Sequence, residues 1–237
     1  MNFILKRIVF ALKKYNMLEN SDNLAVAVSG GKDSLVLLLL LAKIRQYFDL
    51  KFTINVITLD MCFNNAPTDF SNIKAFCNTL GLPYFIKITN LWDIIFIKRK
   101  EKSPCSLCSK MRKGILNEVA ISLGCNKIAL GHHMDDAVET IFMNIIYNNR
   151  LSCFSPVTYL SKKKITMIRP LIFCKESQIS NIATKFNLPV KKNECKQDKK
   201  TKRQKIKDVL NSIEANTQKG FKDNFFKSFL KSGLNGW

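Results

Sequence analysis

Short apolar runs and longer apolar segments alternate along most of the chain. The short runs are rich in β-branched residues and predict buried strands, at residues 24–28, 52–59, 84–88, 127–130 and 165–168. The longer segments predict helices, at residues 35–44, 68–80, 105–123 and 135–147. This alternation indicates βαβ units, and therefore an α/β fold with a doubly wound, mainly parallel sheet.

Both ends of the chain depart from this alternation, which predicts helical additions to the α/β domain. Residues 1–23 contain an amphipathic helix and a polar turn, and charge interrupts its apolar patch too often for a signal peptide. We therefore predict three parts, at residues 1–23, 24–190 and 191–237, of which the last is basic and helical. No apolar run has the length of a membrane span, so we expect a cytoplasmic protein without a membrane partner.

The charge balance indicates a polyanionic partner. The formal net charge is +20, from 38 Lys and Arg against 18 Asp and Glu. A coding bias towards Lys, Asn and Ile would also raise this number. However, basic residues concentrate in segments 98–113 and 191–208, beside cysteines. That placement favours a nucleic acid as the partner.

The cysteines form a candidate metal site, because eight cysteines in a cytoplasmic protein are not expected to form disulfides. Cys105 and Cys108 make a C-x-x-C pair, which is typical of a redox pair, a zinc half-site or an iron–sulfur half-site. No second C-x-x-C follows. Cys195 is the best third ligand because nearby lysines would stabilise its thiolate. Cys62 and Cys174 are weaker candidates.

A glycine loop joins the first predicted strand to the first long helix. Its glycines allow the backbone to approach a phosphate, and the free N–H groups of the helix start attract negative charge. The lysine adds a cation, and the aspartate indicates a metal ligand or a cap. The spacing matches neither the Walker A motif nor the dinucleotide fingerprint. The loop consists of Ser29, Gly30, Gly31, Lys32, Asp33 and Ser34.

Two further polar segments follow predicted strands. Asp60 ends the second strand, and residues 131–136 follow the fourth. Ligands of open α/β sheets lie beyond the carboxyl ends of strands, so one nucleotide can contact both segments and the glycine loop. Asp60 is expected to meet a ribose or an attacking group. Asp135 and Asp136 are expected to hold Mg²⁺ against phosphate oxygens, although Asp135 also suits a helix cap.

The order of these motifs resembles that of the tRNA 2-thiocytidine synthetase family, within the PP-loop ATP pyrophosphatases. The resemblance covers roughly residues 20–210 and rests on residues 29–34, 59–60, 104–114, 129–136, 168–171, 195 and 201–204. It implies an adenine nucleotide alpha hydrolase-like fold. It also implies that ATP, cleaved to AMP and diphosphate, adenylates C2 of a cytidine in the tRNA anticodon loop, at position 32. Sulfur then replaces the C2 oxygen.

The resemblance also implies residue roles and partners. Cys105, Cys108 and Cys195 match the ligands of a 4Fe–4S cluster, and Asp60, Arg112 and Asp136 match catalytic positions. Asp33 and Asp136 would bind Mg²⁺. The expected partners are tRNA and a sulfur donor such as a cysteine desulfurase or inorganic sulfide, and a homodimer is left open. The implied nucleotide contacts are Ser29, Gly30, Gly31, Lys32, Asp33, Ser34, Leu59, Gly131 and Asp136.

Two other functions are weighed against thiolation. One is a PP-loop ligase that joins an amine to an adenylated base, as lysidine synthetases do, but amine attack needs no thiolate. The other is a nucleotide-responsive RNA-binding protein without catalysis. That function explains the charge but not the combination of Asp33, Asp136 and the cysteine pair.

Overall fold

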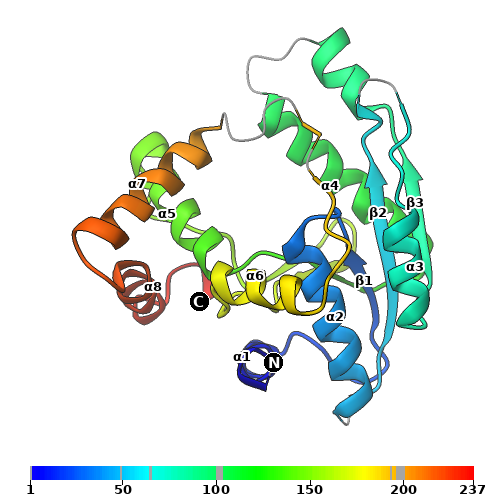
Figure 1. Cartoon of the computed structure of the whole chain (residues 1–237), viewed down its shortest axis with the longest axis horizontal. Coiled ribbons are helices and arrows are strands. Elements are labelled where there is room, and N and C mark those ends of the chain that lie inside the picture. The colour runs from blue at the N-terminus through cyan, green and yellow to red at the C-terminus, as the bar shows by residue number, and fades with distance from the viewer. Residues whose placement is uncertain (1, 49, 64–65, 100–103, 193, 196–200) are drawn as a thin grey trace.

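The computed structural model describes residues 2–48, 50–63, 66–99, 104–192, 194–195 and 201–237. Its centre is a six-stranded sheet with the strand order β3-β2-β1-β4-β6-β5 (Figure 1). Neighbouring strands are parallel except β5 and β6, which pair antiparallel. The strands are β1 (Asn23–Ala27), β2 (Thr53–Asp60), β3 (Tyr84–Ile88), β4 (Lys127–Ala129), β5 (Val157–Leu160) and β6 (Ile165–Ile168).

Helices cover the sheet and form both ends of the described chain. Figure 1 shows α5, α7 and α8 grouped on one side of the molecule and α3 beside β2 and β3 on the other. The helices are α1 (Asn2–Lys14), α2 (Lys32–Tyr47), α3 (Ser71–Thr79), α4 (Pro104–Ser122), α5 (Met134–Asn148), α6 (Glu176–Lys185), α7 (Lys202–Asn216) and α8 (Phe221–Lys231), with a π-helix η2 (Asp93–Lys98) and a 3₁₀ turn η3 (Leu234–Gly236). None of the helices in these described residues is both long and apolar enough to cross a membrane.

The sheet is covered on both faces, as a doubly wound fold requires. Side chains of a strand alternate between the two faces. On β1, Leu24 and Val26 belong to the large core that contains α2, whereas Ala25 belongs to a second cluster. Leu116 and Ala120 of α4 complete that second cluster. The predicted α/β fold with a mainly parallel sheet is therefore confirmed.

Helix α2 is the most buried element, which explains its leucine-rich sequence. Residues 35–41 are all at most 5% exposed. The helix packs against α6 and β1. A helix that is apolar all round is stable only where neighbours cover every side. Its position fixes the glycine loop, because α2 starts at Lys32 inside that loop.

The sequence analysis missed β5, η2 and α6. β5 is a four-residue edge strand whose burial is only partial, so its pattern is too short to identify it. The basic C-terminal helices share the main core: Ile206 and Leu210 of α7 and Phe226 of α8 belong to the same cluster as α2. The predicted boundary at residue 190 stays a prediction.

Candidate nucleotide and cysteine site

The glycine loop leaves β1 and turns sharply into α2. Gly30 has φ +85°, which a residue with a side chain rarely adopts, and its carbonyl accepts a hydrogen bond from the N–H of Lys191 at 2.9 Å. The Ser34 hydroxyl donates to the Gly31 carbonyl at 2.9 Å, and the Ser29 N–H donates to the Ser34 oxygen at 3.2 Å. The side chain of Ser34 thus closes the loop from within and leaves the N–H groups of the first helical turn available for an anion.

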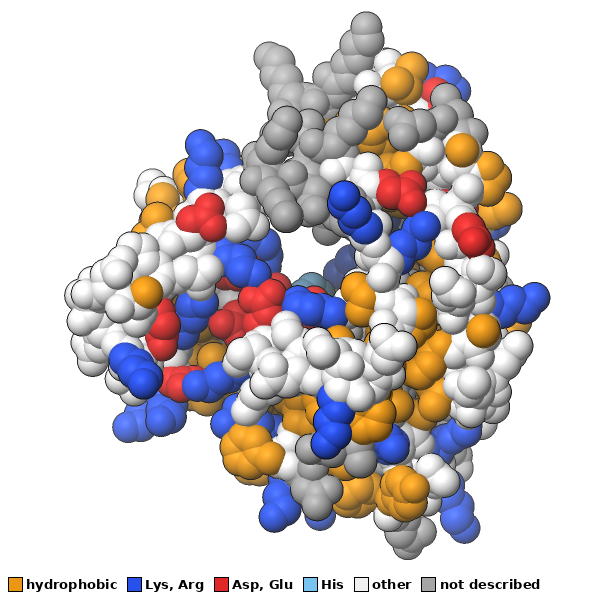
Figure 2. Space-filling view, viewed as in Figure 1, with side chains coloured by type: hydrophobic (Ala, Val, Ile, Leu, Met, Phe, Trp, Pro, Cys, Tyr) orange, Lys and Arg blue, Asp and Glu red, His pale blue; other side chains and the backbone are white. Residues whose placement is uncertain are grey.

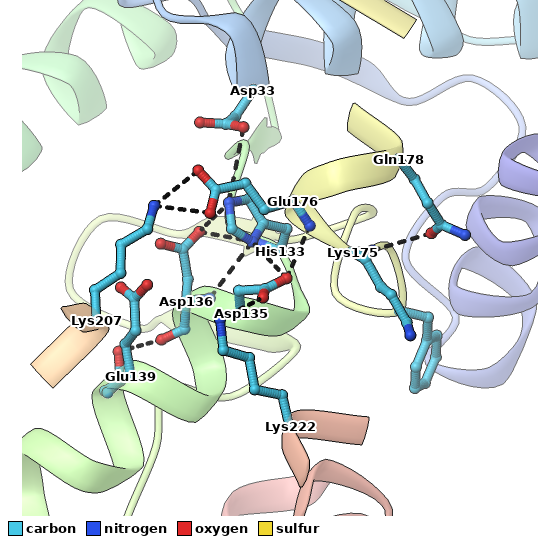
Figure 3. Close-up of polar contacts among 12 residues, drawn as sticks. Asp33, His133, Asp135, Asp136, Glu139, Lys175, Glu176, Gln178, Lys207 and Lys222 are labelled. Atoms are coloured by element: carbon cyan, nitrogen blue, oxygen red, sulfur yellow. Dashed lines mark hydrogen bonds and ion pairs between the residues drawn. The ribbon is translucent and has the colours of Figure 1, made fainter. Parts of the chain in front are cut away.

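The Lys32 ammonium forms ion pairs with two carboxylates instead of extending as a free cation toward a phosphate. Its ammonium lies 3.0 Å from Asp33 Oδ1 and 3.0 Å from Glu176 Oε1. Glu176 also pairs with Lys207 at 2.7 Å (Figure 3). Burial alone would raise the pKa of Glu176, but hydrogen bonds from Lys207 and Lys32 outweigh it and lower this pKa to about 2. The glycine loop is therefore linked to α6 and α7 through one ionised carboxylate.

The segment after β4 packs directly on the start of α2. A Cβ at Gly131 would lie 3.1 Å from the backbone of Asp33 and Ser34, so only glycine fits there without a shift. His133 and Asp136 form a reciprocal capping box at the start of α5, in which the N–H of His133 donates to Asp136 Oδ2 at 3.0 Å. The cap that the sequence assigned to Asp135 is supplied by these two residues. Asp135 instead accepts from the N–H of Glu176 at 2.8 Å.

Three carboxylates surround the buried ring of His133 (Figure 3). Its Nε2 lies 3.4 Å from Asp136 and 3.7 Å from Asp33, and its Nδ1 lies 3.9 Å from Asp135. Lysine and arginine side chains balance these acids: Lys222 lies 3.5 Å from Asp135. In the described residues no group of three His, Cys, Asp or Glu is arranged to hold a metal ion. The Mg²⁺ ligands expected at Asp33 and Asp136 stay a prediction.

Arg203 and Glu139 also belong to the site. Arg203 was expected to contact tRNA within the basic segment 191–208, and Glu139 was assigned no role from the sequence. The Arg203 guanidinium lies 3.3 Å from Asp136 and 3.4 Å from Glu139, and it donates to the Thr140 hydroxyl at 3.1 Å. Burial and the nearby Asp136 raise the pKa of Glu139 to about 7. A glutamate in a helix of mixed composition carries no local signal of such burial, so only the packing of α7 on α5 reveals it.

A cavity of about 720 Å³ joins the glycine loop to the cysteines. Figure 2 shows the molecule hollowed at this face, with acidic side chains on one wall and Lys and Arg side chains at the rim. Most of the expected site residues line it, but Gly30, Lys32 and Asp60 do not. The predicted residues that line the cavity are Ser29, Gly31, Asp33, Ser34, Leu59, Cys105, Cys108, Arg112, Gly131, Asp136 and Cys195.

The three predicted cysteine ligands meet at this cavity. Cys105 and Cys108 lie one turn apart on α4, and Cys195 reaches the cavity from the segment before α7. Burial and then the neighbouring Cys195 raise the pKa of the Cys105 thiol. Burial also raises the pKa of Cys108, although Arg112 opposes it. Since these sulfur atoms influence one another electrostatically, the fold places them close together.

The alternative third ligands do not reach the cavity. Cys174 is fully buried in the main core, and burial raises its pKa to about 12. Cys62 does not line the cavity. Asp60 is 2% exposed, and its carboxylate accepts from the N–H groups of Cys62 at 2.9 Å and Thr68 at 2.8 Å. It holds the loop after β2, and its expected contact with a ribose or an attacking group stays a prediction.

Two nitrogen-bearing side chains, His132 and Arg169, line the cavity, and neither was assigned a role from the sequence. Arg169 is 6% exposed and lines the cavity, and no acidic partner lies within 4 Å of it in the described residues. Burial lowers its pKa to about 10, so it remains a cation at neutral pH. Burial also lowers the pKa of His132 to about 4, so its ring is neutral. An uncompensated buried cation favours an anionic ligand.

Comparisons with known proteins place the chain in a family. The family model of the PP-loop domain matches residues 5–213. The tRNA-cytidine(32) 2-sulfurtransferase of Dechloromonas aromatica (strain RCB) is 36% identical over 202 residues, which are 84% of this chain and 70% of that protein. The enzyme of the same name from Bdellovibrio bacteriovorus is 36% identical over 212 residues, which are 89% of this chain and 81% of that protein.

A solved structure has the same fold. The U34-tRNA thiolase NcsA from Methanococcus maripaludis, determined with its 4Fe–4S cluster, superimposes with a TM-score of 0.73. The alignment covers 97% of this chain and 78% of that chain at 23% identity, which establishes the fold and no more. The chain belongs to the PP-loop family and, within it, to the tRNA 2-thiocytidine synthetases. It is accordingly an enzyme of the tRNA sulfurtransferase class, which decides against amine ligation and against a protein without catalysis.

Proposed function

We propose that this protein uses ATP to adenylate C2 of cytidine 32 in the tRNA anticodon loop and then replaces the C2 oxygen with sulfur. The observation that carries the proposal is the shared cavity: the glycine loop, Arg112 and the three cysteines Cys105, Cys108 and Cys195 open onto one space. Activation and sulfur transfer can then act on one bound base. The names of its relatives support cytidine 32 as the target.

Adenylation makes the C2 oxygen a good leaving group. The oxygen attacks the α-phosphorus of ATP, an O–P bond forms, and the bond from that phosphorus to diphosphate breaks. The N–H groups at the start of α2 face the cavity with Gly31 and Ser34, where they can hold the phosphates. Arg169 also lines the cavity, and its positive charge can bind the phosphates as well. In the second step a C2–S bond forms and the C2–O bond breaks, which releases AMP.

The three cysteines Cys105, Cys108 and Cys195 at one cavity support an iron–sulfur cluster as the bound group. In a 4Fe–4S cluster each cysteine binds a different iron atom. With three protein ligands the fourth iron keeps an open position. When bound, the cluster would supply the site that presents sulfur to C2.

The chain's own residues set the conditions for cluster binding. The raised pKa of Cys105 and of Cys108 means that both thiols are protonated at neutral pH and lose their protons when iron binds. Arg112 favours the thiolate of Cys108. We derive no step through Mg²⁺, because Lys32 already pairs with Asp33 and Arg203 with Asp136.

Replacing Cys195 tests the proposal. Cys195→Ala removes one of three thiolates, so the protein purified without oxygen should lose its iron and the visible absorption of the cluster. It should make no 2-thiocytidine and should still bind ATP, because the glycine loop is built from other residues. Cys77→Ala is the control, since Cys77 is fully buried in the core and does not line the cavity. Wild-type protein that binds zinc and no iron would contradict the cluster.

A further inference from the structure

The C-terminal segment, which begins in the last turn of α7, contacts the wall of the cavity from behind. This segment, residues 214–237, lies outside the 5–213 range of the PP-loop family match. Trp237 is 7% exposed and packs against Phe226 and Phe229 of α8, with ring centroids 5.4 and 5.9 Å away. Its indole N–H donates to the carbonyl of Phe154 at 2.8 Å, and Phe154 lines the cavity.

Phe154 in turn holds the two nitrogen-bearing side chains of that wall. Its ring lies 5.0 Å from the ring of His132, centroid to centroid. The guanidinium carbon of Arg169 lies 5.1 Å from the centre of the Phe154 ring. His132 Nδ1 and Arg169 Nε are buried without a hydrogen-bond partner in the described structure. Arg169 Nη1 also donates to the carbonyl of Ser155 at 2.6 Å and to the hydroxyl of Thr158 at 3.1 Å. The loop that carries Phe154 therefore holds Arg169 both by ring packing and by a hydrogen bond, and holds His132 by ring packing.

The loop that carries Phe154 depends on such contacts. Residues 151–156 form neither a helix nor a strand, so no ladder of backbone hydrogen bonds fixes them. Asn144 of α5 donates to the carbonyl and the hydroxyl of Ser152, and Arg169 donates to the carbonyls of Ser155 and Pro156. The C-terminal segment adds two bonds: the one from Trp237, and one in which the side-chain oxygen of Asn235 accepts from the N–H of Cys153 at 2.8 Å. Both act on consecutive residues of the loop.

We propose that Trp237 is a positioning residue of the site, which sets Phe154 and through it His132 and Arg169. It touches no substrate in this arrangement, because it does not line the cavity. Its effect on the reaction rests on the proposed function, in which the wall of His132 and Arg169 receives the activated base and its phosphate. The C-terminal segment then belongs to the catalytic architecture of this chain, although it lies outside the matched domain.

Trp237→Phe tests this role without removing the aromatic packing. The chain contains only two histidines, so the imidazole signals of His132 and His133 can be followed separately by NMR. Trp237→Phe loses the hydrogen bond to Phe154, so the His132 signals should shift while those of His133 stay. Asn235→Ala should shift His132 as well. Phe225→Leu is the control, because Phe225 anchors α8 on Phe142 of α5 and leaves both signals in place.

Kinetics provide the second measurement. In the full chain, Trp237→Phe should lower kcat/KM for tRNA by about tenfold, since misplacement on the order of 1 Å costs up to a hundredfold. Because the proposed function places Arg169 beside the ATP phosphates, the KM for ATP should rise as well, and an unchanged Tm separates this effect from general instability. Unchanged His132 signals in Trp237→Phe and Asn235→Ala would overturn the positioning role. If wild-type protein releases no AMP, the proposed function fails, and the His132 signals still decide the role of Trp237.

Discussion

Gly131→Ala should damage the nucleotide site through backbone contact alone. The added Cβ would lie 3.1 Å from the carbonyl carbon of Asp33 and from the N–H nitrogen of Ser34, and 3.3 Å from the Asp33 oxygen. Carbon contacts are favourable at about 3.5 Å or more, so the two segments must separate by about 0.4 Å. All three atoms are backbone, and no side-chain rotation relieves the contact.

The cost has two parts that can be measured separately. Overpacking of this kind costs about 1–3 kcal/mol of folding stability, and Tm should fall by about 2–4 °C for each kcal/mol in a chain of this size. The separation also moves the N–H groups that face the cavity at the start of α2. Losing about 1.4 kcal/mol of phosphate binding would raise the Kd for ATP tenfold.

Calorimetric titration with ATP and a thermal scan check both parts, with Gly114→Ala as the matched control. Gly114 lies inside α4, and an added Cβ there meets no atom within 4 Å. Alanine is the better helix former by about 1 kcal/mol, so this variant should keep its ATP affinity and gain stability. Wild-type Tm and wild-type ATP affinity in Gly131→Ala would refute the close contact between the β4 loop and α2.

Three further predictions concern charge. The pKa of Glu139 is raised from 4.5 to about 7, so the folded state binds a proton that the unfolded state releases. The contribution of Glu139 to folding stability therefore declines as pH rises from about 4.5 through 7. Glu139→Gln should remove this decline, which denaturant titrations at several pH values would measure. The pKa of Glu176 is lowered to about 2, so its contribution to folding stability is present above pH 4.5 and is lost as pH falls toward 2. The stability of Glu176→Gln should not show this loss in acid. Lys110→Glu with Lys113→Glu on α4 should reduce the salt dependence of tRNA binding by a slope of at most about 2, and an unchanged slope would show that α4 does not contact the RNA.

The second basic segment lies partly outside the described residues. Lys199 was expected beside Arg203 on the tRNA path, but residues 196–200 are not described. Arg203 itself is engaged with Asp136 and Glu139. A charge reversal there would disturb the nucleotide site as well as any RNA contact, which is why the test of RNA binding uses α4.

Local pattern was enough for the fold class and for locating the segments that carry the candidate site residues. Five strands and the glycine loop could be located because strand periodicity and the requirement for glycine are properties of short segments. The C-x-x-C pair on α4 is local in the same sense, since residues three apart share one face of a helix. Each of these features needs only residues that are neighbours in the sequence.

Tertiary structure decided which distant residues meet. Cys195 and Cys105 line the same cavity, although about 90 residues of chain separate them. Glu176 links Lys32 of the glycine loop to α7, although Lys32 and Glu176 are 144 residues apart. The Asp60 carboxylate accepts hydrogen bonds from the loop that follows it, and its expected contact with a ribose or an attacking group stays a prediction. Sequence reasoning identifies a chemical group, whereas burial and the direction of a side chain depend on the packing of the whole chain.

The same reason explains why Phe154 and Trp237 could not be assigned from the sequence. Both are apolar residues in segments without periodicity, where an aromatic ring is equally suited to the core. Their relation to His132 and Arg169 arises only because α8 packs on α5 and brings residue 237 behind residue 154. The sequence by itself determined the fold class and pointed to the candidate reactive groups. The packing of α5, α7 and α8 decided how the side chains around them are held.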